Sequence, residues 1–287
     1  MGGPHNCGFT LRNFYVRLSP MTNKTASPAH EQVGHRFAPW KTSVTAARQH
    51  GYHDPAGIDS KRFGDWVDVS LLGNDCLKGA RSPDDLGNPR LHYGVRVRQT
   101  MPLALGTGLV VQAVVTAVEP VRRGRLIRIT FAFLAESGQI PVEIEHQSLI
   151  LDPDPIGTDP APAVDRSWSK AEAIRDVPMS LASVSGYSHE FPYLEGHHNQ
   201  AAAEAIGMRA PIAQGLHGFT LLMSEIAADR GAPSACDIQA EFRRPIFCDE
   251  TVRLVGQRGA DDQWDDLAVL KGDGKPTTQV HVFSATW

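Results

Sequence analysis

The sequence predicts an α+β fold in which two similar units each wrap an antiparallel sheet around a central helix. Two observations carry this prediction. Apolar residues alternate with polar ones in two separate groups of strands, and a strongly apolar helical pattern precedes the second group. The chain has 287 residues, which is enough for two units of roughly 100–150 residues each.

The helical pattern lies within Arg209–Gly231. Its apolar residues recur at steps of three and four: Leu216, Phe219, Leu222, Met223, Ile226 and Ala227. Charged residues occur only near its end, and Gly231 followed by Pro233 predicts where the helix stops. Because this helix is apolar on most sides, other elements must cover it, and we expect the neighbouring strands to do so.

Strands are predicted from period-two alternation. In Arg125–Leu134, the apolar side chains of Ile127, Ile129, Phe131 and Phe133 fall on one face. The turns between the first strands are expected at Arg122–Gly124 and Glu136–Gly138. The predicted strands of the first group are Val95–Arg98, Leu109–Val118, Arg125–Leu134 and Ile140–Ile150, and those of the second are Asp237–Arg243, Glu250–Gln257, Asp265–Lys271 and Thr277–Trp287.

Four regions follow from these patterns: a flexible N-terminal extension over 1–30, a degenerate unit over 31–151, a proline-rich linker over 152–164, and a second unit over 165–287. A proline, Pro102 or Pro245, precedes each group of strands. A helix wrapped by a curled antiparallel sheet, occurring twice, is the arrangement called a double hotdog. Only the second unit has an obvious long helix; we place its counterpart within Thr42–Leu72, with loops at Gly51–Gly64 and Asn74–Asn88.

Composition excludes several classes of function. A net charge of -4 and a pI near 6.3, with no long basic run, argue against nucleic-acid binding. No apolar run approaches the ~18 residues of a membrane span, and the N-terminus lacks the apolar core of a signal peptide. We therefore expect a cytoplasmic protein without membrane contact.

Cysteine and histidine spacing predicts neither a disulfide framework nor a metal site. No cysteine pair has metal-ligand spacing, so free thiols in a reducing compartment are expected: Cys7, Cys76, Cys236 and Cys248. The histidines of the first unit are likewise scattered without ligand-like spacing: His35, His50, His53 and His92.

Two runs of the second unit resemble a known family. The run G-M-R-A-P-I-A-Q-G-L spans Gly207–Leu216, and E-F-R-R-P-I-F begins 26 residues after Gly215, at Glu241. Together they resemble the MaoC-like dehydratases, which include the (R)-specific enoyl-CoA hydratases and carry G-F-x-x-P-I-x-H-G, a helix, and then F-x-x-P-V-x-x-G-D. The resemblance covers 165–287, and 31–150 looks like the partner hotdog.

The resemblance implies addition of water to the double bond of a 2-enoyl thioester, or the reverse elimination from a 3-hydroxyacyl thioester. It implies that the backbone N–H of Gly215 holds the thioester oxygen. It also implies that Pro211, Ile212 and Gln214 contact the substrate, and that no organic cofactor or metal is required. Gln214 stands where the family has histidine, so it can form hydrogen bonds but cannot titrate.

The family's acid–base histidine maps onto His197, ten residues before Gly207 and eighteen before Gly215. His198 is adjacent. The family's D-x-N-P-x-H loop is altered here, since Pro192 occupies the position where the catalytic Asp is expected. Ser185-Gly186-Tyr187 stands where the family often has S-G-D, and the spacing of twelve residues from Ser185 to His197 exceeds the family's spacing of about seven.

The role of the missing Asp is open. Glu195 is the nearest carboxylate in sequence, His189 and Glu190 lie in the enlarged loop, and Tyr187 or Tyr193 could supply a proton or contact substrate. Each residue also has a structural interpretation: the histidines as ordinary loop residues, and Glu195 as a solvated charge. The enlarged loop over 186–196 is either a remodelled apolar pocket wall or a loop packed over the domain.

The sequence therefore predicts a hydratase/dehydratase that acts on acyl-CoA. A hotdog thioesterase and a non-catalytic acyl-CoA-binding or partner subunit remain alternatives. Sheets of this kind often pair again, which makes a homodimer one expected assembly. Arginines near the site either bind CoA phosphates or form surface salt bridges: Arg209, Arg243 and Arg244.

Overall fold

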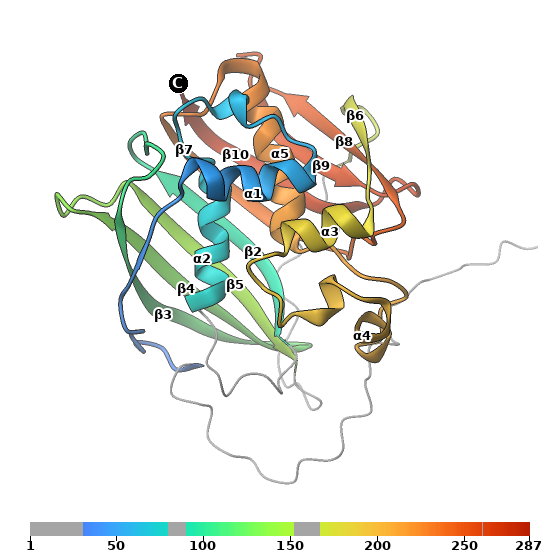
Figure 1. The fold of residues 1–287 in the computed structure, drawn as a ribbon, viewed down its shortest axis with the longest axis horizontal. Coiled ribbons are helices and arrows are strands. Elements are labelled where there is room, and N and C mark those ends of the chain that lie inside the picture. The colour runs from blue at the N-terminus through green and yellow to red at the C-terminus, as the bar shows by residue number, and fades with distance from the viewer. Residues whose placement is uncertain (1–30, 80–89, 152–166, 260) are drawn as a thin grey trace, which may run out of the picture.

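The computed structural model describes residues 31–79, 90–151, 167–259 and 261–287 (Figure 1). The expected extension over 1–30, which includes Cys7, and the whole of the expected linker over 152–164 lie outside this part. Ten strands form one sheet in which every pairing is antiparallel. Their bounds are β1 Trp40–Thr42, β2 Arg90–Gln99, β3 Leu109–Val121, β4 Gly124–Ala135, β5 Val142–Leu151, β6 Glu172–Pro178, β7 Ala235–Phe242, β8 Thr251–Arg258, β9 Trp264–Leu270 and β10 Pro276–Thr286.

The sheet order is β1-β3-β4-β5-β2-β7-β10-β9-β8-β6. Read inward from the two edges, the halves have matching orders, β1-β3-β4-β5-β2 and β6-β8-β9-β10-β7. The halves join where β2 pairs with β7, with Val97 opposite Ile238 and Gln99 opposite Cys236. The predicted double hotdog fold is therefore confirmed, and the sheets of the two halves are continuous.

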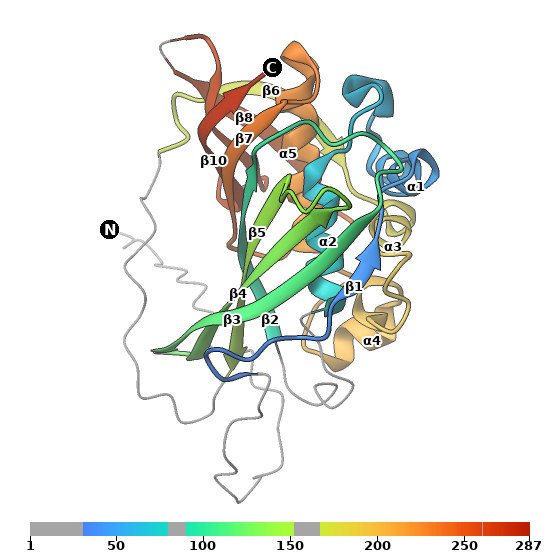
Figure 2. The same ribbon diagram turned by 90° about the vertical axis from the view of Figure 1, so that its left-hand side faces the viewer.

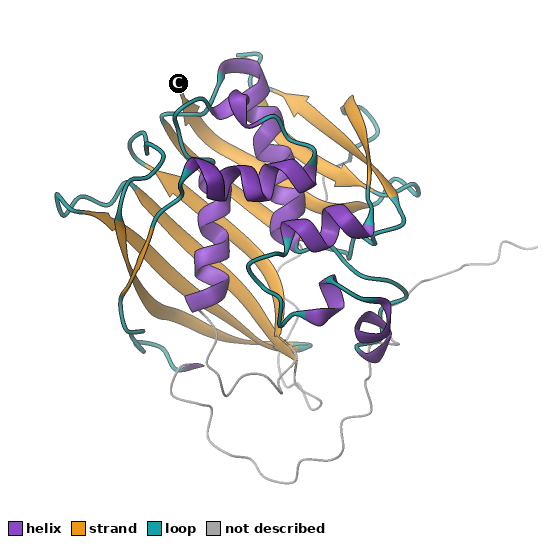
Figure 3. Ribbon diagram, in the orientation of Figure 1, coloured by secondary structure: helices purple, strands orange, loops and turns teal. Residues whose placement is uncertain are grey.

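All described helices lie on one face of the sheet, which curves around them (Figures 2 and 3). The α-helices are α1 Ala46–Ala56, α2 Leu72–Gly79, α3 Leu181–Tyr187, α4 Gln200–Ala205 and α5 Gly215–Arg230. Three short 3-10 helices complete the set: η2 Ser60–Phe63, η3 Val69–Leu71 and η5 Glu195–His197. None of these helices is long and apolar enough to cross a membrane.

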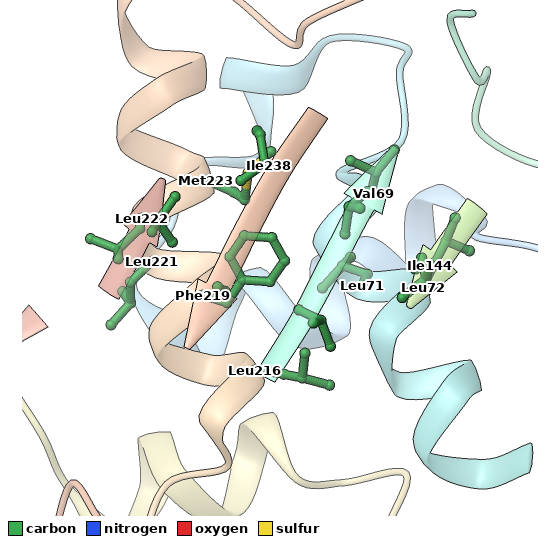
Figure 4. Close-up of a cluster of buried hydrophobic side chains, with 14 of the residues drawn as sticks. Val69, Leu71, Leu72, Ile144, Leu216, Phe219, Leu221, Leu222, Met223 and Ile238 are labelled. Atoms are coloured by element: carbon green, nitrogen blue, oxygen red, sulfur yellow. The ribbon is translucent and has the colours of Figure 1, made fainter. Parts of the chain in front are cut away.

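Helix α5 is the centre of the second half, as predicted. Every residue from Leu216 to Ala227 is buried, and Gly231 ends the helix with a positive φ of 84°. Figure 4 shows Leu216 and Phe219 of α5 gathered with Leu72 of the first half and Ile238 of β7 in one apolar core. One core thus serves both halves, and it fixes the start of α5 relative to α2.

The predicted position of the first-half helix was wrong. The central helix of that half is α2, which begins at Leu72 and runs through residues expected to be loop, while α1 extends through Ala56. The periodicity failed because Asn74 and Asp75 are polar yet buried. Asp75 accepts hydrogen bonds from Thr42 and Arg48, two residues distant in sequence that no local pattern reveals.

Candidate functional site

A tight turn leads into α5 and is held by pairing with the segment that precedes β8. Ala213 N–H donates to the Ile246 carbonyl over 2.8 Å, and Cys248 N–H donates to the Pro211 carbonyl over 2.9 Å. The turn closes on Gly215, where an added Cβ would lie 2.6 Å from the ring of Phe242. Only glycine fits this close approach, and as the first residue of α5 it has an N–H without an intrahelical acceptor.

The loop that carries His197 is attached to this turn by two hydrogen bonds. The His197 Nδ1 lies 2.6 Å from the carbonyl oxygen of Ile212, and the Ile212 N–H donates to the Gly196 carbonyl over 3.3 Å. Because a carbonyl can only accept, Nδ1 carries the proton, and Nε2 is the basic nitrogen of the neutral ring. The structure therefore holds the basic histidine and the Gly215 turn together through one residue.

His198 has a different environment. Its Nδ1 lies 2.8 Å from the Ser185 hydroxyl and its Nε2 lies 3.0 Å from the Phe191 carbonyl. The carbonyl requires a proton on Nε2, so Nδ1 accepts from Ser185. Both ring nitrogens of His198 are thus used to tie the loop to the end of α3.

Two polar side chains are buried at the start of α5. Gln214 is 5% exposed and His217 is 1% exposed, and none of their side-chain nitrogens and oxygens has a hydrogen-bond partner among the described residues. Burial lowers the pKa of His217 to about 3, so its ring is neutral. His217 was not predicted as a site residue, although one polar ring within the apolar run from Leu216 to Phe219 was a signal for it.

Tyr187 packs against this group from α3. Its ring stacks on His217 with centroids 4.5 Å apart, and its hydroxyl lies 2.8 Å from Thr220 Oγ1. Burial raises the pKa of Tyr187 well above its usual range. The two other predicted site residues lie nearer the surface: Tyr193 is half exposed, and the exposed Glu195 carboxylate has no hydrogen bond or ion pair with the described residues.

The enlarged loop is anchored on the first half of the molecule. Glu190 receives hydrogen bonds from Arg48 over 2.8 and 3.0 Å and from Tyr52 over 2.6 Å, and it pairs with Lys78 at 2.7 Å. Burial alone would raise the pKa of Glu190, but the hydrogen bonds from Arg48, Lys78 and Tyr52 lower it to about 2. Phe191 beside it is fully buried. Glu190 and Phe191 therefore pack the loop over the domain.

The arginines considered as phosphate ligands mostly form salt bridges. Arg209 pairs with Asp249 and Glu250 and stacks over Phe247, and Arg243 pairs with Glu241. Arg244 donates to the Pro276 carbonyl over 2.9 Å. The salt-bridge interpretation is thus confirmed for Arg209 and Arg243.

A cavity of about 530 Å³ lies in the first half, between β1, the start of α1 and the end of α2. Its lining includes Trp40, Arg48 and Lys78 but no residue of the His197 loop or the Gly215 turn. Within the described part of the chain, no group of three or more His, Cys, Asp or Glu residues is arranged to hold a metal ion. Cys76, Cys236 and Cys248 are free thiols.

Comparison with solved structures finds this fold in proteins of low sequence identity. HtdX from Mycobacterium tuberculosis matches with a TM-score of 0.69 at 17% identity, over 85% of this chain and 98% of that chain. A MaoC-like dehydratase from Phytophthora capsici matches with a TM-score of 0.66 at 18% identity, over 86% and 95%. An acyl-ACP thioesterase from Bacteroides thetaiotaomicron matches with a TM-score of 0.53 at 12% identity, over 86% and 96%.

No family model and no curated protein matches the sequence. The chain therefore shares the fold of MaoC-like dehydratases, and this fold also occurs in thioesterases. A shared fold does not determine the reaction, which depends on the residues of the site.

Proposed function

We propose that this protein is a hydratase/dehydratase that interconverts a 2-enoyl thioester and its 3-hydroxyacyl thioester, with acyl-CoA as the substrate class. One observation carries the proposal: Ile212, which belongs to the turn before Gly215, is hydrogen-bonded to the loop of His197 through both its carbonyl and its N–H. A basic imidazole and a helix N-terminus without a side-chain cap are thereby held on two segments that are hydrogen-bonded to each other.

The chemistry follows from these two groups. The Gly215 N–H and the positive end of α5 stabilise negative charge that develops on the thioester oxygen. In hydration, Nε2 of His197 takes a proton from the water that attacks C3, while a second group delivers a proton to C2. We assign that second group to Tyr187, and we place the Gln214 carboxamide, Pro211 and Ile212 against the acyl thioester.

The proposed reaction requires no organic cofactor or metal, because the thioester itself makes the proton at C2 acidic once its oxygen is held. It does require acid–base groups for both carbons. His197 serves C3, and its tautomer is suited to that role because the Ile212 carbonyl keeps the proton on Nδ1.

Incubation of the purified protein with crotonyl-CoA and longer 2-enoyl-CoA esters tests the proposal. Loss of the enoyl absorbance without release of free thiol is the expected result. The same reaction with the His197→Ala variant shows how much of the loss of enoyl absorbance depends on this protein's site. A substrate that survives unchanged with the wild-type protein, across all chain lengths, would contradict the proposal.

The thioesterase alternative is supported by the likeness to the acyl-ACP thioesterase fold and by the position at which the family's Asp is replaced. In that case the same loop would direct water to the carbonyl carbon, and free thiol would appear in the same assay. Binding of CoA esters with neither change would instead indicate a non-catalytic subunit.

A further inference from the structure

A chain of buried hydroxyl groups runs from Tyr187 to a carboxylate in the first half. The Tyr187 hydroxyl lies 2.8 Å from Thr220 Oγ1, and Thr220 Oγ1 lies 3.0 Å from Ser70 Oγ. Ser70 Oγ donates to Asp68 Oδ1 over 2.7 Å. All four residues are fully buried, so the chain is shielded from bulk water along its whole length.

The direction of each hydrogen bond in this chain is determined. A hydroxyl has one proton to donate, and that of Ser70 goes to Asp68. Thr220 must therefore donate to Ser70, and Tyr187 must donate to Thr220. Every proton points toward Asp68, which leaves the Tyr187 oxygen as the accepting end of the chain.

Other contacts hold the two ends in place. His53 Nε2 lies 3.1 Å from the second oxygen of Asp68, and His53 Nδ1 lies 2.9 Å from Ser60 Oγ. The Tyr187 oxygen, whose proton goes to Thr220, keeps its lone pairs for a reacting group. Glu190, the other carboxylate that acts on Tyr187, is neutralised by Arg48 and Lys78.

We propose that Tyr187, Thr220 and Ser70 form a proton relay through which the Asp68 carboxylate acts as the base for C2, replacing the carboxylate that the loop lacks. This inference rests on the proposed hydratase/dehydratase function. In the relay, Tyr187 contacts the substrate, whereas Thr220, Ser70 and Asp68 act through Tyr187. The relay joins the two halves, since Tyr187 and Thr220 belong to the second and Ser70 and Asp68 to the first.

Protons and electrons balance in the dehydration direction. The C2–H bond breaks and its proton passes to the Tyr187 oxygen, while the Tyr187, Thr220 and Ser70 protons each move one step, which leaves Asp68 protonated. The electron pair forms the C2–C3 double bond as the C3 hydroxyl leaves. The His197 imidazolium protonates that hydroxyl, and water departs. Hydration is the reverse, starting from protonated Asp68 and neutral His197.

The test uses a matched pair of substitutions at the middle of the relay. Thr220→Val keeps the size of the side chain but removes its hydroxyl, whereas Thr220→Ser keeps the hydroxyl. We expect Thr220→Val and Tyr187→Phe each to lower kcat on 3-hydroxybutyryl-CoA about 10²-fold, the scale of one acid–base contribution. Thr220→Ser should recover most of this loss, and the Tyr187→Phe/Thr220→Val double variant should be no worse than either single variant.

A second measurement separates a relay from structural support. The rate is recorded against the fraction of D₂O, because several protons that move together give a curved dependence and one proton gives a linear one. We expect a curve for the wild type and for Thr220→Ser, and a line for Thr220→Val. If Thr220→Val does not fold, Ser70→Ala interrupts the relay one step further on and takes its place.

Three results would overturn the relay. If Thr220→Val retains normal turnover while Tyr187→Phe loses it, Tyr187 acts in the reaction but Asp68 takes no part in it. Thr220→Val and Thr220→Ser can lose activity and melting temperature equally, with the D₂O dependence unchanged, which would make the chain a packing feature. A curved dependence of the rate on the D₂O fraction that is unchanged in Ser70→Ala would also make the chain a packing feature. Absence of wild-type activity would instead refute the proposed function.

Discussion

The two halves of the molecule differ most in how their central helices begin. In the first half, η3 runs directly into α2, and the Asp68 side chain accepts the Ser70 N–H at its start. In the second half, α5 begins at Gly215, and its N-cap residue Gln214 makes no capping hydrogen bond. A carboxylate therefore occupies the positive end of one helix, and the other remains open to an anion.

Under the proposed function, the two halves of this repeated fold take separate tasks. The open helix end, the Gly215 turn and His197 lie in the second half. The first half contributes the Asp68 cap and the cations Arg48 and Lys78, which hold the enlarged loop through Glu190. Substitutions should therefore separate activity from stability along the same division, with the largest effect expected at His197.

His197→Ala should lower turnover about 10²–10⁴-fold while leaving the fold intact, because it removes one acid–base group from a partly exposed position. His198→Ala is the matched control. Its ring nitrogens hold Ser185 and Phe191, so it should lower the melting temperature and affect turnover much less. Steady-state kinetics on crotonyl-CoA and thermal melts of both variants check this. Equal activity in wild type and His197→Ala would contradict the site.

Gln214→Asp gives α5 a carboxylate cap of the kind that Asp68 provides for η3, which runs into α2. A carboxylate there would accept the free N–H groups and place negative charge where the thioester oxygen is expected to bind. We expect turnover to fall about 10²–10³-fold, comparable with the loss of an oxyanion contact. Gln214→Asn introduces a neutral cap of the same size and should cost less. If Asp and Asn reduce kcat equally, charge at this helix end has no part in the reaction.

Glu190→Gln should affect stability and its pH dependence more than chemistry. The pKa of Glu190 is lowered from 4.5 to about 2 in the folded protein. Its ionisation therefore stabilises the fold fully above pH 4.5, and that contribution is lost as pH falls toward about 2. Urea unfolding midpoints should drop less for Glu190→Gln than for wild type across this window, and the variant should be less stable at pH 7. Parallel pH curves for the two proteins would rule this out.

The sequence was sufficient to predict α5 and most of the strands, because the positions of these elements follow from local alternation and from stop signals such as Gly231. It was insufficient for α2, where buried Asn74 and Asp75 depend on distant partners. The short edge strands β1 and β6 were also missed. In the site, counting along the chain predicted His197 and Gly215, and the structure joins their segments through Ile212, fifteen residues after His197. Their catalytic roles stay predictions. No counting could join Tyr187 to Asp68, since three elements separated in sequence form that chain.

Glu195→Gln is expected to have the smallest effect. Glu195 is the carboxylate nearest to His197 in sequence, yet it is exposed and unpaired with any described residue. A solvated carboxylate is stabilised by water in its charged form and gains little by exchanging a proton with a substrate in a dry site. We therefore expect kcat to change by less than roughly twofold, below the range of an acid–base contribution.

The comparison with Asp68 makes this last substitution informative. The two carboxylates compete for one role, and they come from different halves of the molecule. If Glu195→Gln lowers kcat as strongly as His197→Ala while Thr220→Val does not, the second half is complete by itself and the relay to Asp68 is wrong. If Glu195→Gln is neutral and Thr220→Val is impaired, the second half depends on the first for its base.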